Sequence, residues 1–168
     1  FFDSTFVDKA YEDKAFPIGE KQTISQPFTV AFQTELLEVK KREKILEIGT
    51  GSGYQSAILA TLGARVYTVE RIERLHIQAK KRFSVYYPMI RNYFRDGYKG
   101  LAEFAPFDKI LVTAAANSIP ISLLKQLKLN GILVIPIGDD AGQEMLKITK
   151  VSDENDFTQK NHGSFKFV

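Results

Sequence analysis

The stretch EIGTGSGY, residues 47–54, contains three glycines at alternate positions, 49, 51 and 53. It follows the short apolar run KILEI (residues 44–48) and precedes YQSAILATL, whose apolar residues have the spacing of a helix. Glycines in this arrangement let the backbone turn tightly after a strand and approach a ligand at the N-terminus of a helix. The stretch therefore predicts a strand, a glycine-rich turn and a helix in succession.

The same alternation continues toward the C-terminus. RVYTV (residues 65–69) is β-branched and aromatic, and the segment after it, to about Phe83, carries apolar residues at helical spacing among its charges. IRNYF, FDKILVTA and GILVIPIG are three further strand-like runs, with helical stretches near residues 98–104 and 120–127 between them. VAFQTELL near the N-terminus also looks helical. Such alternation predicts βαβ units around a mostly parallel sheet.

The pattern changes after Gly138. MLKITKV and FKFV are predicted strands without a helix between them, and SDENDFTQKNHGS is interpreted as a polar connecting loop. The predicted fold class is α/β, with a Rossmann-like, doubly wound, mostly parallel sheet, helices on both faces and an antiparallel C-terminal edge. Residues 1–168 are expected to form a single domain, with its core at 41–138 and the antiparallel strands at 139–168.

Composition narrows the function classes. No run approaches the roughly 20 apolar residues of a membrane span, and the N-terminus FFDSTFVDKA lacks the layout of a signal peptide. The absence of cysteine excludes disulfides and thiol nucleophiles, and His76 and His162 have no partner at ligand spacing, so no metal is predicted. The net charge is +3, and residues 71–95 hold seven Lys or Arg against one Glu. We interpret that stretch as a solvated face.

The glycine spacing discriminates between cofactor classes. A dinucleotide fingerprint would require Gly or Ala at position 54, where the sequence has Tyr54, and this argues against NAD. The pattern that is present, acidic-x-Gly-x-Gly-x-Gly, resembles that of S-adenosylmethionine-dependent methyltransferases, and the resemblance implies their class I fold. An ordinary turn between a strand and a helix could carry the same glycines, so the loop alone does not decide the cofactor.

Two acidic residues strengthen the prediction. Glu70 ends the second strand, 21 positions after Gly49, where a carboxylate can accept hydrogen bonds from both ribose hydroxyls. Asp96 follows the third strand and could bind an adenine amine, while the backbone N–H of Gly97 binds a ring nitrogen. Either acid alone could be a surface charge. Together with the glycine loop, at the carboxyl ends of successive strands, they predict S-adenosylmethionine as the cofactor and S-adenosylhomocysteine as its product.

The methyl acceptor is indicated by the segments that flank the glycine loop. The Asn/Asp-Pro-Pro-aromatic motif of nucleobase amino-methylating enzymes is missing, since the corresponding stretch reads AAANSIP, and carbon-5 pyrimidine methylation would need a cysteine. The segments AYEDKAFPIGEKQTISQPFTVAFQTELL, LEIGTGSGYQSA and APFDKILVTAAANSIPISLLKQLKLNGILVIPIG instead resemble protein-L-isoaspartate O-methyltransferases over almost the whole chain. TIS-x-P ahead of the glycine loop is highly specific to that family.

The resemblance implies an activity and a site. The family methylates the free α-carboxyl group of L-isoaspartyl residues in age-damaged proteins and peptides, which initiates their repair. Residues 1–40 would form the segment and helix that cover the cofactor and substrate, and Ser25 would be the active-site residue. Substrate contacts are implied for Thr23, Ser25 and Ala115, and cofactor contacts for Gln22, Ile24, Glu47, Gly49, Thr50, Gly51, Ser52, Gly53, Glu70, Asp96 and Gly97.

The chemistry places few demands on the protein. The attacking α-carboxylate is already ionised near neutral pH, because such groups have pKa values of roughly 3 to 4, so no general base is required. Catalysis is then mostly positioning, and Ser25 can donate a hydrogen bond that orients one carboxylate oxygen while the other attacks. The alternative is that Ser25 is a helix N-terminal residue, with Pro27 in the first turn, and both roles can hold together.

Three residues depart from the family pattern. Arg95 replaces the glycine that is usual before Asp-Gly, Phe28 stands where many members have histidine, and Asn117 where many have proline.

Two other function classes stay open: a methyltransferase of another substrate such as nucleic acid, and a catalytically silent binding module of the same fold. The expected partners are proteins and peptides that contain L-isoaspartate, and the expected protein is a cytoplasmic monomer without membrane contact.

Overall fold

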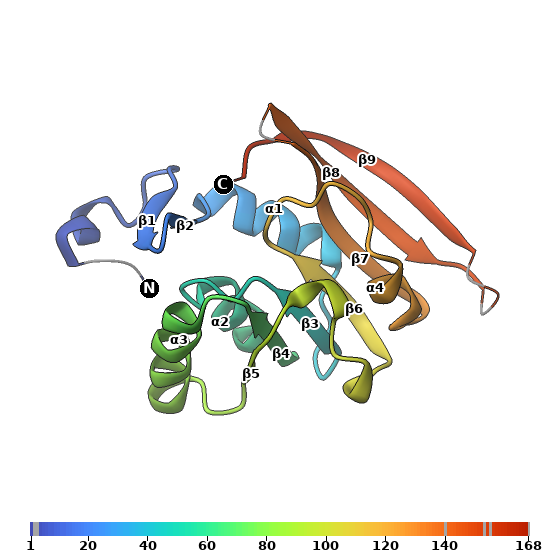
Figure 1. Ribbon diagram of the computed structural model, residues 1–168, viewed down its shortest axis with the longest axis horizontal. Helices are drawn as coiled ribbons and strands as arrows, with labels where there is room; N and C mark the ends of the chain where they lie inside the picture. Colours follow the sequence, from blue (N-terminus) through green and yellow to red (C-terminus); the bar gives the residue numbers. More distant parts are fainter. Residues whose placement is uncertain (2–3, 140, 153, 155, 168) are drawn as a thin grey trace.

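The structure, a computed structural model, describes residues 1–168 except 2–3, 140, 153, 155 and 168 (Figure 1). Within that part of the chain, seven strands form one sheet in the order β5-β4-β3-β6-β7-β8-β9. The first five strands of this order are parallel, and β8 and β9 add to them in antiparallel pairing. The strands are β3 (Lys44–Ile48), β4 (Arg65–Glu70), β5 (Arg91–Phe94), β6 (Phe107–Val112), β7 (Leu127–Asp139), β8 (Gly142–Lys150) and β9 (Phe157–Phe165).

Helices cover both faces of the sheet (Figure 1). α1 (Pro27–Leu37), α2 (Tyr54–Thr61) and α3 (Glu73–Tyr86) pack on one face, and the short α4 (Ile121–Lys125) packs on the other. Successive residues of a strand point to opposite faces. Accordingly Ile45 and Leu111 join the core under α1 to α3, Leu46 and Ile110 join the core under α4, and all four are fully buried. The predicted fold class is confirmed.

The order of the strands creates a switch point beside β3. From β3 the chain builds outward through β4 to β5, and it then returns to place β6 on the other side of β3. The connections on the two sides of β3 therefore diverge at the carboxyl ends of the strands. In open α/β sheets this divergence leaves the crevice in which ligands bind.

A second, two-stranded sheet lies ahead of α1 and was not predicted from the sequence. β1 (Phe16–Gly19) pairs antiparallel with β2 (Gln22–Ile24). Glu20 and Lys21 close the hairpin with φ values of 53° and 57°. Two successive residues with positive φ are typical of the tight turns that join β-hairpins, which usually contain glycine or asparagine. The missing turn signal explains why the hairpin escaped prediction.

The helix predicted near residues 98–104 is wrong. Two short 3₁₀ turns, η2 (Gly97–Lys99) and η3 (Ala102–Phe104), occupy this region, and a further one, η1 (Ser4–Lys9), precedes β1. The side chain of Gln126 binds the backbone between the two turns, because its Oε1 accepts from Leu101 N at 2.9 Å and its Nε2 donates to Lys99 O at 2.8 Å. A long-range side chain thus replaces the hydrogen bonds of a continuous helix.

The interpretation of residues 152–164 as a connecting loop is also wrong. Strand β9 begins at Phe157 and ends at Phe165, so most of FTQKNHGS is extended and paired with β8, and FKFV contributes only its first residue to the strand. Val168 lies outside the described residues. β9 forms the edge of the sheet and most of its side chains are exposed. Polar and charged residues are common on edge strands because they prevent further pairing, and this hides the strand in the sequence.

Candidate active site

A cleft of about 740 Å³ opens at the carboxyl ends of the parallel strands, at the switch point beside β3. Among the segments that line it are the glycine loop after β3, the end of β4, the turn after β5, residues 113–118 after β6, the end of β7, and the strap 22–26, which contains β2 and leads into α1. Lys166 and Phe167, which follow β9, also line it. Segments that are far apart in the sequence therefore meet at one edge of the sheet.

At Gly49 and Gly53 the glycine loop approaches its neighbours so closely that a side chain would not fit. All three glycines of residues 49–53 have positive φ, and a Cβ atom placed on Gly49 would lie 2.6 Å from Oγ1 of Thr113. Thr113 Oγ1 donates to the Gly49 carbonyl at 2.7 Å, so the loop after β6 fastens the loop after β3. The sequence predicted the tight turn correctly but gave no signal for Thr113.

Glu70 braces the glycine loop from the end of β4. Its side chain is buried, its Oε2 accepts from Gly51 N at 2.8 Å, and its Oε1 accepts from Ile72 N at 2.9 Å. Each carboxylate oxygen has a second acceptor site, and the residue lines the cleft. Glu70 therefore supports the loop and can still accept hydrogen bonds from a ligand with vicinal hydroxyls.

Glu47 lies fully buried at the base of the cleft. Ser56 Oγ donates to its Oε2, whereas its Oε1 has no hydrogen-bond partner in the described part of the chain. Burial raises the pKa of Glu47 to about 7, although the hydrogen bond from Ser56 opposes this shift. A buried acceptor without a partner is costly, and a ligand that brings a hydrogen-bond donor or a positive charge would relieve that cost.

The turn after β5 carries the other predicted acid. Asp96 is exposed at the cleft, and its Oδ1 accepts from Tyr98 N at 3.0 Å. A Cβ on the buried Gly97 would meet Cγ2 of Ile48 at 2.3 Å, so only glycine permits this approach. Arg95, the departure from the family pattern, does not line the cleft, because its guanidinium pairs with Glu103 at 2.6 Å. The substitution is therefore accommodated away from the site.

The strap 22–26 contributes Ser25 to the cleft. Ser25 is half-buried, and its hydroxyl makes no hydrogen bond within the described residues. The alternative role of Ser25 as a helix cap is wrong, because the N-cap residue of α1 is Gln26. The side chain of Gln26 makes no capping hydrogen bond to the first turn of α1. Pro27 begins the helix as predicted, and Phe28 N donates to Asp13 Oδ1 at 2.9 Å. The Ser25 hydroxyl is thus available to a ligand.

A buried glutamine supports the wall opposite the strap. Gln33 projects from α1, and its Nε2 donates to the carbonyl of Val112 at 3.1 Å, where β6 ends and the loop 113–118 begins. The side chain is almost wholly buried. The only indication of this role in the sequence is that Gln33 is a polar residue among the apolar residues of VAFQTELL. Gln33 and Thr113 are both supporting residues that the sequence did not identify.

The predicted site residues mostly come together. Glu47, Glu70, Ser25 and Ala115 line the same cleft, as do Gln22, Thr23, Ile24, Gly49, Thr50, Gly51, Ser52, Asp96 and Gly97. Gly53 does not line it, and instead forms the left-handed N-cap of α2. Phe28, on α1, also lies outside, and its ring stacks on those of Phe32 and Phe165, whereas Asn117 lines the cleft.

Two further features of the described residues concern the requirements of a metal site and of a membrane span. Among the described residues, no group of three His, Cys, Asp or Glu side chains is arranged to hold a metal ion. The rings of His76 and His162 pack near Phe94 and Phe32, with centroid distances of 5.7 and 6.3 Å. The helices of this part of the chain are all too short or too polar to cross a membrane.

The chain is similar to known proteins over its whole length. The family model for protein-L-isoaspartate(D-aspartate) O-methyltransferase (PCMT) matches residues 1–168. Proteins named protein-L-isoaspartate O-methyltransferase from Flavobacterium johnsoniae and Christiangramia forsetii are 56% and 55% identical, over 100% of this chain and 78% of each relative. A crystal structure of such an enzyme from Plasmodium falciparum, in complex with S-adenosyl-L-homocysteine, has a TM-score of 0.83 and 26% identity, covering 94% of this chain and 80% of that one.

The buried carboxyl group of Glu47 makes the stability of the protein depend on pH. Its pKa rises from the ordinary value of 4.5 to about 7 in the fold, so the associated stability is fully present below pH 4.5 and is lost as the pH rises through about 7. Between about pH 5 and pH 8, the free energy of unfolding of the wild type should therefore fall relative to that of Glu47→Gln, by roughly 3 kcal/mol at most. Urea unfolding at both pH values measures the difference. Glu35→Gln, at an exposed position, is the control. If the free energies of unfolding of the wild type and Glu47→Gln differ by the same amount at both pH values, the raised pKa is contradicted.

Proposed function

This chain belongs to the protein-L-isoaspartate O-methyltransferase family, and we propose that it transfers a methyl group from S-adenosylmethionine to the free α-carboxyl group of L-isoaspartyl residues in damaged proteins and peptides. The transfer would initiate their repair. The observation that carries the proposal is that one cleft is lined both by the glycine loop with Glu70 and by the strap that carries Ser25.

The cleft fits the cofactor by the chemistry of its donors and acceptors. Glu70 keeps free acceptor sites for ribose hydroxyls, Asp96 and the backbone of Gly97 would hold the adenine, and the glycine loop admits a ligand against bare backbone. The unpartnered Oε1 of Glu47 would accept from a cationic group of the cofactor. When bound, S-adenosylmethionine supplies an activated methyl group on a sulfonium centre.

The remaining cofactor contacts come from the strap and the loop. Gln22 and Ile24 would cover the cofactor from above, and Gly49, Gly51, Thr50 and Ser52 would lie beneath it. A buried hydrogen bond between the hydroxyl groups of Thr50 and Thr68, 2.7 Å apart, fixes this floor. Gly53 would act indirectly, by starting α2 behind the loop.

The chain's own residues would position the substrate carboxylate. The Ser25 hydroxyl donates to one oxygen and leaves the other to form the methyl ester, and no proton has to be removed from an ionised carboxylate. Thr23 and Ala115 would contact the substrate from the two walls of the cleft. Gln33 and Thr113 hold the second wall in place through backbone carbonyls. Rate enhancement would come mainly from this orientation and from exclusion of water.

The basic stretch 71–95 gives no support to a nucleic-acid methyltransferase. Four of its seven basic residues are engaged within the protein, as Arg74 with Glu20, Arg82 with the Ser52 carbonyl, Arg91 with Tyr67 and Arg95 with Glu103. We further propose a monomeric enzyme. The proposed location is the cytoplasm, and the proposed division of the chain keeps residues 1–40 as the covering segment, 41–138 as the core and 139–168 as the antiparallel strands.

The substrate assignment can be tested by transfer of a labelled methyl group. The protein should methylate a synthetic peptide that contains L-isoaspartate and should not methylate the otherwise identical aspartyl peptide, because only the former presents a free α-carboxyl group beside the backbone. Equal labelling of the two peptides, or no labelling of either, would overturn the proposed function.

Removal of the Glu70 carboxylate should weaken cofactor binding. Ribose hydroxyls would lose charged acceptors and the glycine loop would lose its brace, so Glu70→Ala should cost about 1 to 3 kcal/mol of S-adenosylhomocysteine affinity. Titration calorimetry measures the change, with Glu73→Ala as the control, since Glu73 is exposed on α3 and does not line the cleft. Unchanged affinity in a folded Glu70→Ala protein would exclude the ribose role.

Substitution of Ser25 should separate cofactor binding from turnover. Ser25→Ala should leave S-adenosylhomocysteine affinity nearly intact but lower kcat/KM for the isoaspartyl peptide roughly ten- to a hundredfold, or about 1.4 to 2.7 kcal/mol. The same assays on Ser84→Ala, an exposed serine on α3, control for loss of a hydroxyl group elsewhere. Thermal unfolding of Ser25→Ala should change little, because the hydroxyl does not cap α1. A folded Ser25→Ala enzyme with full kcat/KM would remove Ser25 from the active site.

A further inference from the structure

The charges that line the cleft divide into two groups. Glu47, Glu70, Arg71 and Asp96 belong to the end that holds the glycine loop and the ends of β4 and β5. Lys166 and Asp139 are the other two charged residues among the described residues that line the cleft, and the backbone next to Asp139 joins the loop 113–118, since Gly138 N donates to Ala116 O at 3.0 Å. On the proposed function, this second group faces the peptide that carries the isoaspartyl residue.

The backbone of Lys166 is fixed on both sides. The ring of Phe165 lies 5.1 Å from that of Phe32 and 6.4 Å from that of Phe28, nearly parallel to the latter, so β9 is packed against the first turns of α1. Phe167 N donates to Oε1 of Gln143 at 2.7 Å. Lys166 is therefore held close to the strap that carries Ser25, which precedes Phe28 by three residues.

Gln143 also joins Lys166 to the opposite charge on the rim. Its side chain is almost completely buried, and its Nε2 donates to the carbonyl of Asp139 while its Oε1 accepts from Phe167. The Asp139 carboxylate is exposed and accepts from Ala141 N at 2.9 Å, so it is held by its own turn. Among the ion pairs of the described residues none joins Lys166 to Asp139, and their charges stay separately available at the mouth of the cleft.

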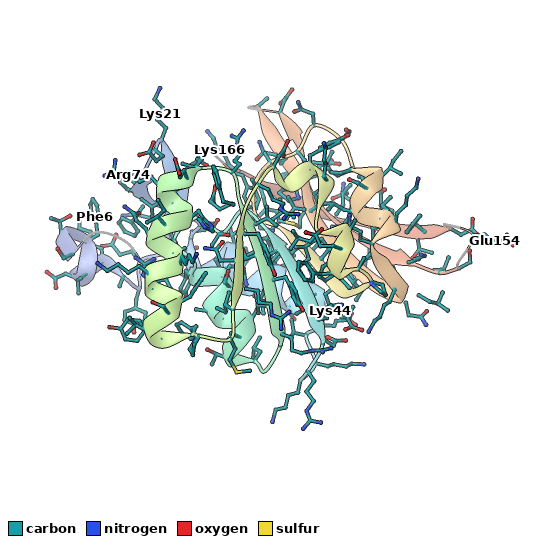
Figure 2. All side chains as sticks on the ribbon, turned by 60° about the horizontal axis from the view of Figure 1, so that its bottom comes forward. Phe6, Lys21, Lys44, Arg74, Glu154 and Lys166 are labelled. Carbon is teal, nitrogen blue, oxygen red and sulfur yellow. The ribbon has the colours of Figure 1, made fainter. Side chains whose placement is uncertain are left out.

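The Lys166 ammonium has no role inside the fold. Within the described ranges it makes no hydrogen bond or ion pair, whereas Lys109, Lys128 and Lys147 each pair with a carboxylate. The side chain is exposed at the cleft rim, on the same side of the molecule as Lys21 at the tip of the β1–β2 hairpin (Figure 2). A cation with a fixed backbone and a free side chain at a binding cleft is suited to an anionic group of the ligand.

We propose that Lys166 sets a charge preference among isoaspartyl substrates, because its ammonium attracts an acidic side chain adjacent to the isoaspartyl residue. Asp139 acts in the opposite sense and favours a basic side chain. Exposed ion pairs contribute little, so the preference is a matter of degree and many flanking sequences remain acceptable. The interaction raises the concentration of productive complex without taking part in methyl transfer, and it therefore acts on KM and leaves kcat unchanged.

The proposal is tested with the full chain and three isoaspartyl peptides that carry Glu, Gln or Lys on either side of the isoaspartyl residue. At low ionic strength the wild type should prefer the Glu peptide to the Lys peptide roughly threefold to fivefold in kcat/KM, through KM. Lys166→Gln should abolish most of this preference, Lys166→Arg should retain it, and Asp139→Asn should increase it. Salt at about 0.5 M should weaken it in the wild type, because exposed charges are screened.

The control is Lys160→Gln, an exposed lysine on β9 that does not line the cleft, which should keep the wild-type preference. Methylation of all three peptides with equal kcat/KM by the wild type would overturn the proposal. An equal loss on every peptide in Lys166→Gln would also overturn it, since that result indicates a structural role. Absence of methylation of any isoaspartyl peptide would instead overturn the proposed function on which the proposal rests.

Discussion

Two backbone N–H groups, those of Gly51 and Ile72, converge on the buried carboxylate of Glu70. Ile48 of β3 pairs in register with Val69 of β4, so the glycine loop leaves the sheet directly beside the residue that braces it. The loop cannot fix its own shape, because its glycines allow many backbone conformations. The carboxylate supplies a constraint from β4, as the Thr113 hydroxyl does from the loop after β6, and together they hold the loop at the switch point where the cleft opens. One side chain thus combines a structural role with the proposed ribose contact.

The neighbouring Glu47 is a second buried carboxylate at this edge of the sheet, and its burial is unfavourable for the charged form. Two carboxylates lie at the ends of adjacent strands, and burial of Glu47 outweighs its hydrogen bonds, so its neutral form persists up to about pH 7. The hydroxyl of Ser56 satisfies one oxygen, and the other has no partner among the described residues. A ligand that donates to that oxygen would both bind and stabilise the fold. Cofactor binding and stability are therefore expected to be coupled through this residue.

The sequence predicted the parts of the fold that local patterns determine. The run KILEI coincides with β3 and RVYTV with all but the last residue of β4, because short apolar runs followed by glycine or charge have few alternatives. The β1–β2 hairpin and the polar edge strand β9 were missed, since unusual turn residues and exposed side chains conceal them. In the site, the glycine loop and the two acids follow from spacing, whereas the supporting roles of Gln33 and Thr113 depend on contacts between residues far apart in the chain. Ser25 was identified through family resemblance, and its lack of a capping bond became evident only in three dimensions.

The central claim is that one cleft brings the cofactor held at Glu70 and the substrate carboxylate held at Ser25 into line. A crystal structure of the protein with S-adenosylhomocysteine and an isoaspartyl peptide tests this most directly. The predicted result places the ribose hydroxyls on the Glu70 carboxylate and the free α-carboxylate within hydrogen-bond distance of the Ser25 hydroxyl, with its second oxygen facing the sulfur across the space of one methyl group. A peptide carboxylate bound away from Ser25, or a ribose bound away from Glu70, would contradict the account.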